Sequence, residues 1–363
     1  MTFKQKMQTI RADLRHNENI RPEHGGGLNQ AAQKYAIEAS QWLDLSTGIN
    51  ANGWPVPELP ADIFNRLPEA DDGLLPAAQQ YYQTRNILPV AGSQQAIQLL
   101  PFVLKKLGLI SDKPRVGLLS PAYSEHEFSW QMDNAQIIYL DRTSISDTIT
   151  GLDVLVIINP NNPDGYLSSP ETLQLWQRQL RKQGGLLIVD EAFMDCTAQS
   201  SLLSVMDFNQ IDNLIILRSI GKFFGLAGIR CGFIMAHKTI LDTMEYYQGP
   251  WSVNNPARYI VRHALTDQQW IEQTRRQLVD DSVYLQELLS AFLIDFDPDA
   301  RISGSCLFKT IVSHRAAELH KCLAQQGILS RLLDDKSGIR FGLPANKTQY
   351  QRLKKSLKII LPA

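Results

Sequence analysis

The chain has 363 residues, which are too many for one small core and suit one large domain with a smaller one. Acidic and basic residues nearly cancel to a formal net charge of −1, and no block of lysines and arginines is present, which excludes a general nucleic-acid binder. No apolar run is long enough to cross a bilayer, and the N-terminus lacks the apolar core of a signal peptide. We therefore expect a cytoplasmic protein. None of the four cysteines forms a C-x-x-C pair or has zinc spacing, so we expect reduced thiols and no metal site.

The first ninety residues contain two turns of interest. Residues 1–21 are polar and are interpreted as an arm, and His24-Gly-Gly-Gly27 is either a plain linker or an anion-tolerant turn. A helix is expected over residues 28–39, followed by a short strand from Trp42 and a loop. Residues 87–90 are a predicted strand that leads into Ala91-Gly-Ser-Gln and a helix start. Backbone N–H groups at such a helix N-terminus suit a phosphate, although an ordinary cap by Ser93 explains the pattern equally well.

From here strands alternate with helical or loop segments. Short apolar runs predict further strands, whereas residues 170–182 predict a helix. These strands are apolar on both faces, which is typical of a mostly parallel sheet covered by helices on both sides. Ligands bind such sheets at the carboxyl ends of the strands. The predicted strands cover residues 116–119, 136–140, 152–158, 186–189 and 214–217.

Five polar residues come just past these strand ends and predict a single site. They are Tyr123, Asn162, Asp190, Ser219 and Lys222. A lysine held away from bulk water on the glycine-rich loop Ser219–Gly232 can form a Schiff base with a carbonyl cofactor, and Ser219 and Arg230 can hold an anion beside it. By itself the loop favours an ordinary surface lysine, and only the rest of the chain reverses that interpretation.

Together these residues supply the contacts that pyridoxal 5′-phosphate requires. The ring nitrogen needs a buried carboxylate such as Asp190, although Asp190 also fits a simple helix cap. The ring needs a stacking partner, for which Tyr123 is suited, and its oxygen needs the amide of Asn162. The phosphate needs fixed donors, which are offered by Gly92, Ser93, Gln94, Ser219 and Arg230.

Three motifs resemble the fold-type I aminotransferases, and the resemblance to their histidinol-phosphate aminotransferase branch covers nearly the whole chain. The motifs are Asn159-Pro-Asn-Asn-Pro-Asp-Gly, Asp190-Glu-Ala-Phe, and Ser219-x-x-Lys222 with Arg230. This resemblance implies a large domain with a mostly parallel seven-stranded sheet, a smaller α+β domain, pyridoxal phosphate and a homodimer. Within the branch, further features are similar to the threonine-phosphate decarboxylase group of cobalamin biosynthesis. They are His24-Gly-Gly, Ser46-Thr-Gly-Ile-Asn50, Ala91-Gly-Ser-Gln, Asp190-Glu-Ala-Phe193 and Pro250-Trp-Ser-Val-Asn254.

The resemblance also implies roles for individual residues. Lys222 would be the Schiff-base lysine and proton donor, and Asp190 would pair the ring nitrogen. Arg340 would take the substrate α-carboxylate. Arg331 and His24 would hold the substrate phosphate. Gly25, Asn50 and Asn162 complete the expected substrate-binding set. The expected ligand is a small phosphorylated amino acid, with neither nucleic acid nor membrane as a partner.

Two positions depart from the aminotransferase pattern. Phe193 stands where aminotransferases usually have tyrosine, which removes a hydroxyl next to the cofactor oxygen; the same replacement is typical of the decarboxylase group. Arg66-Leu67-Pro68-Glu69 lacks the tyrosine with which relatives reach the partner subunit's cofactor phosphate. That cross-subunit contact is left open.

The expected organisation and function follow. Residues 1–45 form an arm and part of the small domain, residues 46–275 the large cofactor-binding domain, and residues 276–363 the small domain. Within the tail, strands are expected over residues 307–312, 328–333 and 339–343, and helices over 316–326 and 347–359. The leading hypothesis is decarboxylation of L-threonine O-3-phosphate to (R)-1-amino-2-propanol O-2-phosphate. The alternative is transamination by a histidinol-phosphate aminotransferase, because substrate pose decides between the reactions and sequence does not show pose.

Overall fold

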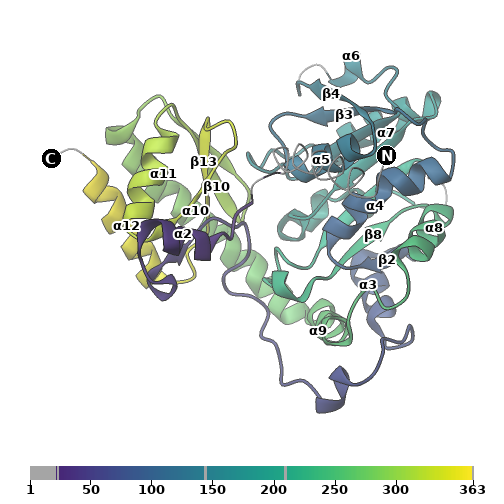
Figure 1. The fold of residues 1–363 in the computed structure, drawn as a ribbon, viewed down its shortest axis with the longest axis horizontal. Helices are drawn as coiled ribbons and strands as arrows, with labels where there is room; N and C mark the ends of the chain where they lie inside the picture. The colour runs from purple at the N-terminus through teal and green to yellow at the C-terminus, as the bar shows by residue number, and fades with distance from the viewer. Residues whose placement is uncertain (1–21, 23, 143–144, 208–210, 362–363) are drawn as a thin grey trace, which may run out of the picture.

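The computed structural model describes residue 22 and residues 24–142, 145–207 and 211–361. The expected arm at residues 1–21 lies outside this part of the chain. Figure 1 shows two bodies: a larger one built on a wide sheet, and a smaller one that contains α11 and α12. The long helix α10 runs from the smaller body toward the larger one (Figure 1).

A seven-stranded sheet forms the larger body, as the sequence predicts. Its order is β2-β8-β7-β6-β5-β3-β4, and all neighbouring strands are parallel except at β8, which runs antiparallel to both β2 and β7. β8 was not among the predicted strands because it follows the glycine-rich loop directly. The strands are β2 (Ile87–Val90), β3 (Arg115–Leu119), β4 (Gln136–Leu140), β5 (Val154–Ile158), β6 (Leu186–Asp190), β7 (Leu214–Ser219) and β8 (Gly232–Met235).

Apolar side chains cover both faces of this sheet. In β5, Val154 and Val156 join one hydrophobic cluster, whereas Leu155 and Ile157 join the other, because successive side chains of a strand point to opposite faces. One face is covered by α4 (Ser93–Lys106), α5 (Ser124–Met132) and α8 (Lys238–Gln248). The other face is covered by α3 (Leu74–Tyr82), α7 (Pro170–Lys182), α9 (Asn255–Thr266) and part of α10 (Gln268–Phe296).

The smaller body contains a four-stranded antiparallel sheet of order β12-β13-β10-β9. The predicted strand at residues 328–333 is divided into two short strands at Ser330, and β9 was not predicted. The N-terminal segment joins this body through the parallel pair of β1 and β11. The elements are α2 (Leu28–Tyr35), β1 (Leu43–Asp44), β9 (Arg301–Gly304), β10 (Phe308–Val312), α11 (Ala316–Gln325), β11 (Ile328–Leu329), β12 (Arg331–Leu332), β13 (Gly338–Gly342) and α12 (Lys347–Ile360).

The remaining short elements are α6 (Ile145–Thr148) and the 3₁₀ turns η1 (Ala39–Gln41), η2 (Ala61–Phe64), η3 (Met194–Ser200), η4 (Leu202–Ser204) and η5 (Ala227–Ile229). The expected domain boundary between residues 275 and 276 falls inside the continuous helix α10. The three-part division of the chain stays a prediction. Within the described ranges, no helix is both long and apolar enough to cross a membrane.

The expectation of reduced thiols is wrong for two of the four cysteines. Cys196 in η3 and Cys306 in the β9–β10 turn form a disulfide across 110 residues of sequence, whereas Cys231 and Cys322 are free. Cysteine spacing shows no such pair because only the packing of the smaller sheet against η3 brings the two residues together. In the described part of the chain, no group of histidine, cysteine and acidic side chains has the arrangement of a metal site.

Candidate active site

The lysine loop connects β7 to β8 and is held from outside by the segment that precedes the proline-rich loop. The backbone N–H of Asn50 donates to the carbonyl of Lys222 at 3.0 Å, and the Asn50 side-chain amide donates to the carbonyl of Phe223 at 3.0 Å. Asn50, expected to bind substrate, therefore supports the loop that carries the lysine. The backbones of Gly53 and Gly225 lie so close together that a Cβ on Gly53 would come within 3.2 Å of the backbone of Gly225. A side chain at position 53 would therefore push the two segments apart.

Lys222 lies near the buried charges of Asp190 and Arg340. Its pKa is lowered from 10.5 to about 8, chiefly by burial and also by the charges of Arg340 and Arg230, whereas Asp190 opposes the shift. These causes place the amine near the three predicted residues Arg340, Arg230 and Asp190. Its Nζ also lies 5.3 Å from the centre of the Phe193 ring, which packs edge-to-face on Phe308 with 5.1 Å between ring centres. An amine that loses its proton near neutral pH is suited to both nucleophilic attack and proton transfer.

Asp190 ends β6 and is buried with a partner that the sequence reasoning missed. Its Oδ2 lies 2.9 Å from Nε2 of His126, and its Oδ1 accepts from the backbone N–H of Ala192. The neighbouring Glu191 points to the opposite side and pairs with Arg218 at 2.9 Å. Asp190 therefore faces the site while Glu191 serves the core. His126 follows the predicted Tyr123 by three residues. A search for polar residues just past the strand ends would therefore have found it if it had been extended by three positions.

The N-terminus of α4 forms a cradle with Arg230. Gly92 has a φ of +77°, and a Cβ at this position would meet Nη2 of Arg230 at 2.6 Å, so the guanidinium lies directly against the glycine turn. Ser93 N lies 2.7 Å from where a Cβ of Gly232 would be. Ser219, also predicted, is buried and its hydroxyl accepts from the N–H of Gly221 at 3.3 Å. A helix N-terminus beside a guanidinium suits a phosphate group.

Arg340 and Asn162 form the carboxylate-binding candidate. A guanidinium N–H of Arg340 donates to the side-chain oxygen of Asn162, and a second donates to the carbonyl of Ser46 at 3.0 Å. Burial and Arg331 lower the pKa of Arg340 to about 10. Its Nε is buried and has no hydrogen-bond partner among the described residues. A buried guanidinium with a donor to spare is suited to a carboxylate ligand.

Glu125 links two predicted residues that come from different ends of the site. Its two carboxylate oxygens contact Nε2 of His24, at 2.6 Å, and the side-chain amide of Gln94. Tyr123 donates from its hydroxyl to Gln94 at 3.3 Å, and burial raises the pKa of Tyr123 above its usual value, with Glu125 and Asp190 adding to the rise. The sequence reasoning also missed Glu125, although it begins the same helix as His126.

A cavity of about 270 Å³ lies on the side of the site where the predicted substrate-binding residues are found. Six predicted residues line it: His24, Gly25, Tyr123, Asn162, Arg331 and Arg340. Gly25 has no room for a side chain because a Cβ would lie 2.3 Å from the carbonyl oxygen of Ser46. Arg331 pairs with Asp334 at 2.5 Å at the mouth of the cavity. The structure thus brings the predicted residues into two adjoining groups, one around Lys222 and one around this cavity.

Comparisons with known proteins agree with this geometry. The model of the aminotransferase class I and II family matches residues 70–340. The chain is 43% identical over 335 residues to a protein named threonine-phosphate decarboxylase from Pseudomonas aeruginosa, covering 92% of this chain and 97% of that one. It is 35% identical to a protein of the same name from a Sinorhizobium species, with the same two coverages.

Among solved structures, the histidinol-phosphate aminotransferase from Clostridium acetobutylicum superposes with a TM-score of 0.73. The two chains are 22% identical, and the match covers 88% of this chain and 98% of the other, which establishes the shared fold. The family model and the two relatives cover most of the sequence and include every strand of the large sheet. The chain therefore belongs to the aminotransferase class I and II family.

Proposed function

We propose that this chain decarboxylates L-threonine O-3-phosphate to (R)-1-amino-2-propanol O-2-phosphate for cobalamin biosynthesis, with pyridoxal 5′-phosphate as its cofactor. The observation that carries the proposal is the grouping of Lys222 with the buried Asp190 and Arg340, beside the start of α4 at Gly92, against which the guanidinium of Arg230 lies. The choice of decarboxylation is supported by the relative that is 43% identical and named threonine-phosphate decarboxylase.

The residues present fit this cofactor. The cradle of Gly92, Ser93 and Gln94 with Ser219 and Arg230 has the donors that a phosphate ester needs. The buried carboxylate of Asp190 suits a protonated ring nitrogen, Tyr123 suits the ring face, and Asn162 suits the ring oxygen. Lys222 would hold the cofactor through its amine. When bound, the cofactor supplies an electron sink for the bond that breaks.

The protein's own groups then orient the substrate and move one proton. Arg340, fixed by Asn162 and Ser46, would bind the substrate carboxylate and set which bond breaks. The carboxylate carbon leaves as carbon dioxide, and the electron pair of that bond stays with the α-carbon. Nζ of Lys222 donates a proton to the α-carbon, and its lowered pKa suits this exchange near neutral pH.

The substrate phosphate would lie between His24 and Arg331. Both side chains line the cavity that also contains Arg340, so one end of that cavity suits a carboxylate and the other a phosphate. Glu125 contacts His24, and Asp334 pairs with Arg331. A phosphate would compete with both carboxylates for the same donors.

The proposal includes a cytoplasmic homodimer. Phe64, Leu67, Tyr246 and Trp251 are large apolar or aromatic side chains with more than half of their surface exposed, which supports burial against a second copy. The loop around η2 extends away from the larger body (Figure 1), as an arm that packs on a partner would.

Incubation with O-phosphothreonine and without a keto acid tests the proposed reaction. We expect stoichiometric release of carbon dioxide and formation of aminopropanol phosphate. If turnover instead requires 2-oxoglutarate, the protein is a transferase, and the alternative of histidinol-phosphate aminotransferase replaces the decarboxylase.

A further inference from the structure

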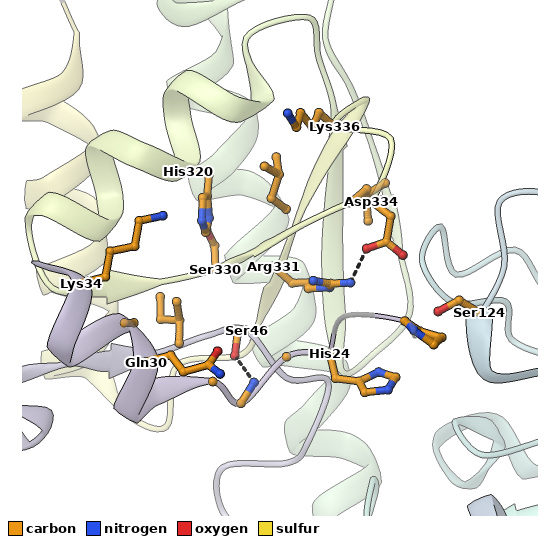
Figure 2. Close-up of a pocket in the computed structure, with 18 of the residues that line it drawn as sticks. His24, Gln30, Lys34, Ser46, Ser124, His320, Ser330, Arg331, Asp334 and Lys336 are labelled. Carbon is orange, nitrogen blue, oxygen red and sulfur yellow. Dashed lines mark hydrogen bonds and ion pairs between the residues drawn. The ribbon is translucent and has the colours of Figure 1, made fainter. Parts of the chain in front are cut away.

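A second, larger cavity adjoins the one that we assign to the substrate. It has a volume of about 700 Å³ and lies between the N-terminal segment with α2, the start of α5 in the larger body, and α11 with β11–β12 in the smaller one (Figure 2). His24 and Arg331 line both cavities, so the proposed phosphate position is their common boundary. The proposed reaction uses only that boundary and leaves the rest of the larger cavity without a role.

Basic side chains from three separate elements line this cavity. Lys34 comes from α2, His320 from α11 and Arg331 from β12, and Figure 2 shows their side chains around the same hollow. Burial lowers the pKa of His320, and the charges of Lys34 and Arg331 lower it further, which means that the three groups act on one another. Nδ1 of His320 lies 2.9 Å from the hydroxyl of Ser330, so the ring is held in place.

Both carboxylates that line the cavity have partners other than Lys34 and His320. Asp334 pairs with Arg331 at 2.5 Å, and Glu127 accepts hydrogen bonds from Tyr139 and Gln131. Neither Lys34 nor His320 has an ion pair with a carboxylate among the residues that the structure describes. The positive charges of Lys34 and Arg331 disfavour a proton on His320, and a bound anion would offset this repulsion. Ammonium, imidazole and hydroxyl donors on one concave wall are suited to the oxygens of a phosphate.

We propose that Lys34, His320 and Ser330 form a second phosphate-binding subsite next to the His24–Arg331 position. Its position relative to the substrate rests on the proposed function, whereas its capacity to bind a phosphate does not. Two sources share this chemistry: free orthophosphate, and the distal phosphate of a ligand longer than phosphothreonine. Orthophosphate is small enough that each subsite would bind its own molecule. Pyrophosphate has two phosphates, so its binding tests whether a single ligand reaches both subsites.

Isothermal titration of the full chain, reconstituted with pyridoxal phosphate, tests the subsite with orthophosphate and pyrophosphate as probes. We expect orthophosphate to bind in two events. Lys34→Met should weaken one event by about tenfold, which is the effect of losing one charged hydrogen bond, and His320→Gln should weaken the same event by a smaller factor, because the lowered pKa of His320 leaves a neutral imidazole; Arg331→Gln should weaken the other event. Lys321→Met is the matched control, because Lys321 is an exposed neighbour of His320 on α11 that does not line the cavity.

The outcomes separate the possibilities. A single binding event that responds only to Arg331→Gln, or equal affinities in all variants, would overturn the subsite. If pyrophosphate binds at least tenfold more tightly than orthophosphate and loses this advantage in Lys34→Met, one ligand spans both positions; equal affinities assign the subsite to free phosphate. Thermal melting of each variant checks that it is folded. Because the wild-type titration needs no turnover, failure of the subsite and failure of the decarboxylase assignment remain distinguishable.

Discussion

The two halves of the candidate site are built in different ways. Around Lys222, the groups come from the ends of parallel strands, and Asp190 at the end of β6 and Ser219 at the end of β7 are buried. Around Arg331, the groups come from the N-terminal segment and from short strands of the smaller body, and His24 is exposed. The comparison separates a rigid half for cofactor chemistry from an exposed half suited to recognising a ligand and releasing it.

Replacing the lysine tests the buried half most severely. Lys222→Arg keeps a positive charge but removes the primary amine, so we expect a fall in kcat of about 10³-fold or more. Borohydride reduction in the presence of pyridoxal phosphate followed by mass spectrometry should tag Lys222 in the wild type and no residue in the variant. Tagging of another lysine would remove Lys222 from the centre of the site.

The pair of Asp190 and His126 tests whether the buried half depends on support from a neighbouring helix. His126→Asn should lower kcat by about tenfold, because losing a buried partner costs the Asp190 carboxylate a charged hydrogen bond. The absorption spectrum of the bound cofactor should shift as well, which a change in overall stability alone would not produce. An unchanged spectrum and kcat would make the contact structural only.

Glu125 is the residue that joins the two halves. Glu125→Gln keeps the shape but removes the negative charge that competes with the substrate phosphate for His24, so we expect KM for phosphothreonine to fall by about tenfold with a smaller change in kcat. Glu287→Gln, at an exposed position on α10, is the matched control. A fall in kcat at constant KM would place Glu125 with the chemistry and not with recognition.

The titration of Lys222 is tested through the free energy of unfolding, measured on the protein without cofactor. Its pKa is lowered from 10.5 to about 8, so the unfolded state binds more protons between these values and stability rises with pH across this window. The contribution is at most about 1.4 kcal/mol per pH unit for one proton. The free energy of unfolding of the wild type should therefore rise from pH 8 to pH 10 relative to that of Lys222→Met, which lacks this titration. Urea unfolding of both proteins at the two pH values measures the change. A constant difference would show that the amine is not buried as described.

Much of the larger body could be predicted because its signals are local. The apolar runs of β2 to β7 lie close together in sequence with their turns, and a parallel sheet directs all their carboxyl ends to one edge. β8 and β9 were missed since β8 follows a glycine-rich loop and β9 has an exposed, partly polar pattern. The two bodies were expected, although the proposed boundary between residues 275 and 276 falls inside α10.

By itself, the sequence determined the strand-end residues, the lysine loop and the family resemblance, because each depends on short spacings. Only the tertiary structure decided which of these groups face one another. His126 on Asp190, Glu125 between His24 and Gln94, and the Cys196–Cys306 disulfide join residues 64, 101 and 31, and 110 positions apart. Such contacts form when helices and the smaller body pack against the sheet, and packing over long separations leaves no periodic trace in the chain.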